Sequence, residues 1–373
     1  MTSHIAKQVG TNWFTVVMGF GIMASLFYAS PVPFRFHQSL GIILFAMDLV
    51  IFITALFFWL WRWGRHTRVA LGDFHDPGKA LFYGALAMAI NVVGNDFFVI
   101  ATHLFDKASM ITVSQVIWLV GVAVGLFSVL VVPYLMFTHH EIEPGDAVAS
   151  WLIPVVPTVV CAADGTNLLP YWGNASVNLG MTYFDISLFG MTFFLFIMVS
   201  ALFYSRLMYH RVIPAELAPS VWIEIGPIGM SMATLATMPF VTATMIPKFT
   251  SGLLGIGMIG GSALWGVGVW WSLIAIFYTL LHTGKKSQGI PYSLGWWSYV
   301  FPLGSFTAGT YAMFHLTNSL FFMVAGGIQL LVLTGFFSVV SYMTFRGVIK
   351  GTLISWHPKR HTHFTIPSVV QED

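Results

Sequence analysis

Long apolar stretches alternate with short polar stretches along almost the whole chain. Ten of the apolar stretches are close to or above the ~20 residues that an α-helix needs to cross the core of a bilayer. They run over roughly Asn12–Tyr28, Leu40–Trp61, Ala80–Ala101, Thr112–Phe137, Val148–Pro170, Asp185–Leu207, Ser220–Met245, Leu253–Leu281, Gly295–Phe314 and Leu320–Phe345. The pattern predicts an all-α integral membrane protein, with a ten-helix transmembrane domain over residues 1–350 and a short tail over residues 351–373.

The composition agrees with a membrane protein and excludes several other classes. The chain is 57% hydrophobic and only 8% charged, whereas soluble domains carry about 25% charged residues. A net charge of +2 is too small to indicate a nucleic-acid partner, and the single cysteine, Cys161, excludes an internal disulfide. The N-terminus runs into the first apolar stretch without a small-residue cleavage pattern, so we expect this stretch to remain as a membrane anchor.

The basic residues fall mostly on one side of the predicted membrane domain. With ten spans, 13 of the 16 Lys and Arg residues lie on the side of the N-terminus, and Arg35, Lys107 and Lys248 lie on the other side. Loops rich in Lys and Arg stay in the cytoplasm. We therefore expect both termini to be cytoplasmic, in a cell or plasma membrane.

An aromatic residue recurs at the start of every odd-numbered stretch. The residues are Trp13, Phe82, Trp151, Trp222 and Trp296. Successive members are 69, 69, 71 and 74 residues apart, which is close to the length of two spans with their loops. A repeat at this nearly constant period suggests five copies of one helical hairpin.

Glycines and prolines concentrate in the same odd-numbered stretches. Those singled out as pore-lining or kink positions are Gly19, Gly21, Gly84, Pro154, Pro157, Gly226, Pro227, Pro302 and Gly304. A proline inside a helix removes one N–H donor and displaces a carbonyl, and a freed backbone group is costly in lipid. We therefore expect the odd-numbered helices to form an inner ring of five around a pore, while the even-numbered helices face lipid. A compact bundle with packing kinks is the alternative.

No Lys or Arg lies at the centre of any predicted span. An anion in such a pore would be stabilised weakly by hydroxyl groups, exposed backbone and the positive edges of aromatic rings, and weak binding suits rapid passage. A neutral conduit also fits small uncharged solutes. Acids within a membrane are candidates for coupling to protons or substrate, and those chosen are Asp96, Asp164 and Glu224, with Arg35 as the cation at the external mouth. Structural, hydrogen-bonded acids are the alternative.

Phe301 stands directly before Pro302 in the ninth stretch. A large ring beside a kink, in a lumen of small residues, is suited to plug that lumen, and rotation of the ring would open it. The alternative is that Phe301 packs against lipid or protein like the other phenylalanines.

Six stretches, taken together and in order, resemble the tellurite-resistance/dicarboxylate transporter family, which includes plant slow anion channels, fungal malate permeases and fungal sulfite exporters. The stretches are NWFTVVMGFGI, SPVPFRF, ALFYGALAM, SWLIPVVPTVV, IEIGPIGMS and WWSYVFPLG. The resemblance implies ten helices in five hairpins, a five-helix pore in each subunit and a homotrimer. It also implies that Phe301 occludes the pore and that the cargo is a small anion.

We therefore expect a transporter of sulfite or of a four-carbon dicarboxylate such as malate, and not an enzyme. A selective chloride or nitrate channel is an alternative, and a membrane redox enzyme or receptor scaffold is an alternative from another class. The 13 histidines lie in predicted loops, tails or helix ends, whereas haem needs imidazoles within a helical bundle. No cofactor, metal or nucleic acid is expected.

Overall fold

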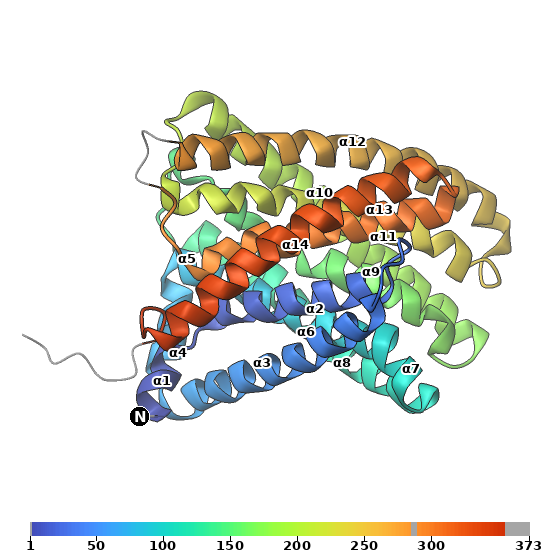
Figure 1. Cartoon of the computed structure of the whole chain (residues 1–373), viewed down its shortest axis with the longest axis horizontal. Helices are drawn as coiled ribbons and strands as arrows, with labels where there is room; N and C mark the ends of the chain where they lie inside the picture. Colours follow the sequence, from blue (N-terminus) through green and yellow to red (C-terminus); the bar gives the residue numbers. More distant parts are fainter. Residues whose placement is uncertain (1, 285–288, 355–373) are drawn as a thin grey trace, which may run out of the picture.

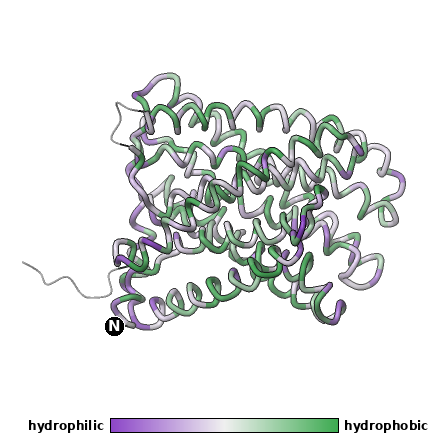
Figure 2. The backbone as a smooth tube through the Cα atoms, viewed as in Figure 1, coloured by the Kyte–Doolittle hydropathy of each residue, from purple (hydrophilic) through white to green (hydrophobic). Residues whose placement is uncertain are grey.

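The computed structural model describes residues 2–284 and 289–354. Over these residues the chain is almost entirely helical and contains no β-strand, as predicted. The long helices run roughly along one direction, with α1 and α4 at one end of the molecule and α7 at the other (Figure 1). Hydrophilic residues gather mainly toward these two ends, and the middles of the helices are mostly apolar (Figure 2).

Ten helices of 12 to 35 residues in the described chain fall into two sets that alternate along the sequence. The first set, called the buried helices here, comprises α2 (Phe14–Tyr28), α6 (Tyr83–Asp96), α9 (Pro157–Leu168), α11 (Ile225–Val241) and α13 (Phe301–Thr317). The second set, called the outer helices, comprises α3 (His37–Arg65), α8 (Lys107–Thr138), α10 (Ala175–Tyr209), α12 (Thr250–Thr283) and α14 (Leu320–Ile349).

Shorter elements connect these helices. The α-helical ones are α1 (Thr2–Gln8), α4 (Thr67–Gly72), α5 (Pro77–Ala80) and α7 (Thr102–Leu104). The 3₁₀ turns outside the starts of the buried helices are η2 (Asp73–His75), η4 (Pro144–Asp146), η6 (Leu169–Tyr171) and η8 (Pro247–Phe249), and one π-helical turn, η3 (Phe97–Ala101), extends α6.

The repeated aromatic residues mark tight turns that precede the buried helices. Four of the five turns are the 3₁₀ segments η1 (Thr11–Trp13), η5 (Ala149–Leu152), η7 (Ala215–Glu224) and η9 (Leu294–Tyr299). The backbone N–H of Phe82 donates to the carbonyl of Lys79 at 3.1 Å, so the turn before α6 has the same three-residue spacing. The aromatic residues that recur in the sequence therefore mark a repeated structural unit, in which a tight turn is followed by an α-helix.

Two prolines expected to kink helices instead begin them. Pro157 and Pro302 lie in the first turns of α9 and α13. At that position the missing N–H has no intrahelical partner to lose, and the fixed backbone angle of proline suits the helix. Pro154 lies in the turns between η5 and α9. The irregular backbone is therefore concentrated before these helices rather than within them.

The outer helices donate hydrogen bonds to carbonyls of the buried helices and of the turns before them. In α10, the hydroxyl of Thr192 donates to the carbonyl of Val155 at 2.8 Å. In α8, Ser114 donates to the carbonyl of Gly94 at 2.7 Å, and the indole of Trp118 donates to that of Cys161 at 2.8 Å. Such side chains make irregular backbone tolerable at membrane depth.

Eight helical segments of the described chain are long and apolar enough to cross a membrane. The α-helical parts of the fifth and ninth predicted spans, α9 and α13, have only 12 and 17 residues and are not among the eight. The predicted ends were close except in α10, which begins ten residues before the predicted Asp185. The side chain of Asn174 accepts hydrogen bonds from the N–H groups of Ser176 and Val177 and so caps α10 there.

The buried helices contact one another in chain order. Contacts join α2 to α6, α6 to α9, α9 to α11, and α11 to α13, and α13 also contacts α2. Each outer helix contacts the buried helix that precedes it in the sequence. The site described next lies among the five buried helices.

Candidate functional site

A small cavity lies among the N-terminal parts of the buried helices and the turns before them. Its volume is about 40 Å³, and residues from all five of these segments line it. They include Thr15, Phe82, Ile153, Pro227 and Phe301. The space has room for only a few water molecules.

A larger cavity lies among the C-terminal parts of the same five segments. Its volume is about 400 Å³, ten times that of the small cavity. The polar side chains that line it are Ser25, Asn95, Asp164, Asn167, Thr237, Tyr311 and His315. Among the described residues, none lines both cavities, and neither cavity is lined by Lys or Arg. An anion in this space would meet hydroxyl, amide, imidazole and carboxyl groups, and no Lys or Arg of the described chain.

Phe301 is the first residue of α13 and lines the small cavity together with Pro302. Its side chain is 4% exposed, so it packs among protein and does not face lipid. Gly226 and Pro227 of α11 line the same cavity. Two buried helices thus bring four of the predicted pore residues together at the small cavity.

The remaining predicted glycines lie where helices approach each other closely, and they do not line the two cavities. A Cβ on Gly84 would lie 1.9 Å from the carbonyl oxygen of Ile153, and one on Gly304 would lie 2.8 Å from Ile22. A Cβ on Gly19 would lie 2.3 Å from the ring of Trp297. These positions therefore need glycine for helix packing.

Asp164 and Asp96 are the predicted coupling acids that lie at or beside the large cavity. Asp164 of α9 lines it, and its Oδ2 has no hydrogen-bond partner. Asp96 of α6 is fully buried and accepts a short hydrogen bond from the hydroxyl of Ser25, which also lines the cavity. Ser25 therefore connects the cavity to a buried acid.

Gly21 separates Asp96 from a second buried acid, Asp48 of α3. A Cβ on Gly21 would lie 3.1 Å from an oxygen of each acid. Neither oxygen of Asp48 has a hydrogen-bond partner. Gly21 thus leaves room for two carboxyl groups between α2, α3 and α6.

Neither Glu224 nor Arg35 lines either cavity. The carboxyl group of Glu224, at the end of η7, accepts a 2.5 Å hydrogen bond from Ser200 of the outer helix α10. Arg35 is exposed in the loop before α3, where its guanidinium lies 4.6 Å from the ring centre of Phe36. The structure does not bring either residue together with Asp96 and Asp164.

Several polar residues at these sites were not identified from the sequence. His315 falls one residue beyond the predicted ninth span, yet α13 continues to Thr317 and His315 lines the large cavity. Asp185 lies buried in α10 and accepts a 2.9 Å hydrogen bond from Thr166 of α9. The available signal was a polar side chain within an apolar run, as for Asn95 and Asn167, which also line the large cavity.

The chain matches the voltage-dependent anion channel (SLAC1) family over residues 8–345. An uncharacterized transporter of Methanocaldococcus jannaschii is 31% identical over 85% of this chain and 87% of its own length. A sulfite efflux pump of Trichophyton rubrum is 26% identical over 89% of each chain. A malic acid transport protein of Schizosaccharomyces pombe is 19% identical over 94% of this chain and 81% of its own length.

The family match extends over all five buried helices and most of the outer ones, so it includes both cavities. Members of this family are anion transporters and channels and not enzymes, which sets aside a redox enzyme or a receptor scaffold. The chain therefore belongs to the voltage-dependent anion channel family and is an integral membrane protein that transports anions.

Proposed function

We propose that the protein carries sulfite or a four-carbon dicarboxylate such as malate through a pore enclosed by the five buried helices. In this arrangement ten membrane helices form five hairpins, and the buried helix of each hairpin contributes to an inner ring. The observation that carries the proposal is that the same five segments line two cavities, one toward each end of the bundle. The contact of α13 with α2 supports a closed ring.

Phe301 is proposed as the gate of this pore. It lies at the 40 Å³ cavity, where its buried ring takes up space between residues of the other segments. The 400 Å³ cavity supplies room for an anion on the far side of the constriction. An apolar constriction blocks ions by excluding water, so removal of one ring is expected to admit them.

The relatives named for sulfite efflux and malic acid transport support these two cargoes over other anions. A chloride or nitrate channel is the alternative, because a lining without Lys or Arg offers no firm contact for a second carboxylate. Measuring the flux of sulfite, malate and chloride into liposomes that contain the protein ranks the three anions as cargoes.

The Phe301→Ala variant tests the proposal directly. We expect anion conductance in liposomes to rise roughly tenfold, because the change removes the ring from the constriction. Phe194→Ala is the matched control, since Phe194 is 64% exposed on the outer helix α10. Conductance that stays at background in the Phe301 variant, or rises equally in both, contradicts the gate.

Proton-coupled transport is a second candidate, supported by the unpartnered oxygen of Asp164 in the large cavity. No Lys or Arg lines that cavity to compensate an ionised Asp164, so a proton that travels with the anion would serve this purpose. Asp96 has access to the same cavity through Ser25. Glu224 and Arg35 are assigned no part in this coupling, because neither lines the large cavity.

Cytoplasmic termini, a plasma-membrane location and a homotrimer complete the proposal. The excess of Lys and Arg on the side of the N-terminus supports the orientation. Because one chain lines both cavities, each subunit of a trimer would contain its own pore. Mass measurement of the protein in detergent gives the number of subunits.

A further inference from the structure

A third cavity opens on the face of the molecule that carries α1. Its volume is about 380 Å³, within the ~300–1,000 Å³ range of small-molecule sites. The charged residues that line it are Lys7 of α1, Arg62 of α3, Asp73 of η2 and Lys79 of α5. Three cations against one carboxylate give this cavity a positive lining, unlike the two cavities between the buried helices.

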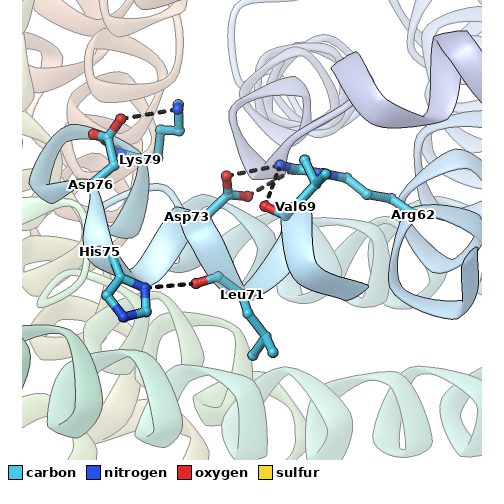
Figure 3. A network of polar contacts seen from close by, with 7 residues as sticks. All are labelled: Arg62, Val69, Leu71, Asp73, His75, Asp76 and Lys79. Carbon is cyan, nitrogen blue, oxygen red and sulfur yellow. Dashed lines mark hydrogen bonds and ion pairs between the residues drawn. The ribbon is translucent and has the colours of Figure 1, made fainter. Parts of the chain in front are cut away.

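A buried ion pair fixes one wall of this cavity (Figure 3). Arg62 Nη1 lies 2.7 Å from Asp73 Oδ2, and Arg62 Nη2 donates to Asp73 Oδ1 at 2.8 Å and to the carbonyl of Val69. Both side chains are only 6% exposed. Arg62 Nε is buried without a hydrogen-bond partner. Asp73 is thus already engaged by Arg62, which leaves the two lysines as the remaining charges of the lining.

The two lysines are far more exposed than this wall. Lys79 lies 3.0 Å from Asp76, but its side chain is 65% exposed, so the pair is weak and readily exchanged. Slight burial would raise the pKa of Asp76, but hydrogen bonds from Lys79 and the N–H of Gly78 hold it below its usual value. Lys7 is exposed and lines the cavity from the opposite element, α1. Both ammonium groups are therefore available to an anion.

Phe82 connects this cavity to the small one. Its side chain lines both, and it precedes α6 at one of the five tight turns. The positive cavity and the small cavity that Phe301 lines therefore share Phe82 in their walls. Rings of Lys or Arg at a mouth raise the local concentration of anions that then enter an uncharged path.

We propose that this cavity is an anion-binding vestibule, in which Lys7 and Lys79 hold a small doubly charged oxyanion beside Phe82 before it enters the pore. The inference rests on the proposed function for the destination of the anion, but the binding step is separate from transport. The vestibule supplies fixed positive charge on the face that carries α1, whereas no Lys or Arg of the described residues lines the two cavities between the buried helices.

Protection of the lysines from acetylation tests binding without transport. We compare the full chain in uncharged detergent in sodium sulfate and in sodium chloride of equal ionic strength, and measure acetylation of each lysine by mass spectrometry. Sulfate is expected to slow modification of Lys7 and Lys79 roughly threefold. Lys350, which follows α14 and does not line the cavity, is the control. Equal rates in the two salts, or equal protection of Lys350, overturn the proposal.

The same measurement identifies the source of the anion. Nanodiscs of phosphatidylcholine or of phosphatidylglycerol replace the detergent, with and without sulfate. Protection by sulfate in phosphatidylcholine supports a soluble oxyanion. Protection that requires phosphatidylglycerol and is independent of sulfate assigns the cavity to a lipid headgroup and overturns the vestibule.

Flux measurements then connect the vestibule to transport. In the Phe301→Ala background, the Lys7→Gln/Lys79→Gln variant is expected to reduce sulfite flux roughly threefold at low ionic strength and less at high ionic strength. Lys350→Gln is expected to leave flux unchanged, and Asp76→Asn, which frees Lys79, to increase it. Sulfate protection without any sulfite flux would contradict the proposed function and leave the binding site intact. Flux that is the same in the double variant as in its parent overturns the vestibule.

Discussion

The buried helices are less apolar than the outer helices, which is the reverse of the pattern in a soluble protein. In the most apolar 18-residue part of each candidate membrane span, 78% of the residues are buried for the spans of α2 and α6, and 83% for that of α11. The corresponding share in the outer helices is 17–39%. Yet the outer helices are the more apolar set, and the buried helices contain four of the five prolines that lie within these ten helices. In a bilayer the most apolar surface faces lipid, so irregular backbone and polar side chains collect inside.

Two kinds of contact join these helices. Close approach at glycines occurs between buried helices, as where a Cβ on Gly229 would lie 2.3 Å from the backbone of Ser305, and also between the two sets, as where a Cβ on Gly257 would lie 2.7 Å from the carbonyl oxygen of Leu235. Side-chain hydrogen bonds, such as that of Thr192 to the carbonyl of Val155, join outer helices to the buried segments as well. Changes at the two kinds of contact should have unequal effects.

The largest expected effect is that of Gly84→Ala. The added Cβ would lie 1.9 Å from the carbonyl oxygen of Ile153, and backbone cannot move aside cheaply. We expect a loss of about 2 kcal/mol or more in the free energy of unfolding, measured by denaturant titration in detergent. Gly190→Ala on α10 is the control, because no atom lies within 4 Å of its Cβ position. It should be neutral or stabilise by up to ~1 kcal/mol. Equal losses in both variants would show that the close contact at Gly84 has no special weight.

The next effect concerns the pH dependence of transport. If Asp164 carries the coupled proton, sulfite flux in the wild type should rise as pH falls, since the acid then binds a proton with the anion. Asp164→Asn should reduce flux roughly tenfold and make it independent of pH. Asp106→Asn is the matched control, because Asp106 is an exposed cap whose pKa is lowered by hydrogen bonds from Ser109. An unchanged pH profile in Asp164→Asn, and likewise in Asp96→Asn, would remove both acids from the mechanism.

The smallest effect is expected from Thr192→Val. This change deletes the hydrogen bonds of the Thr192 hydroxyl with the Val155 carbonyl and the Val159 N–H. We expect a loss of about 1 kcal/mol in the free energy of unfolding, typical of hydrogen bonds in membranes. Thr54→Val on α3, whose hydroxyl bonds only within its own helix, should change stability by less than ~0.5 kcal/mol. A loss in Thr54→Val as large as in Thr192→Val would show that hydrogen bonds between the sets have no special weight.

The sequence predicted the helical class and the alternation of two sets because both depend on local composition. Length and apolarity identify a stretch of membrane helix, and the spacing of Trp13, Phe82, Trp151, Trp222 and Trp296 identified the repeat. Pro157 and Pro302 were interpreted as kinks within helices, whereas both lie in the first turn of a helix. A proline signals a break, but whether it bends a helix or begins one depends on the residues before it, which here form tight turns.

By itself the sequence determined that the protein is a bundle of apolar helices in which the breakers recur at a fixed period, since hydropathy and backbone preference act within a few residues. Only the tertiary structure decided which polar residues meet. Asp164 and His315 line one cavity from helices far apart in the chain, whereas Glu224 faces Ser200 on an outer helix. Side-chain direction and helix contact determine these pairings, and neither is set by the residues adjacent in sequence.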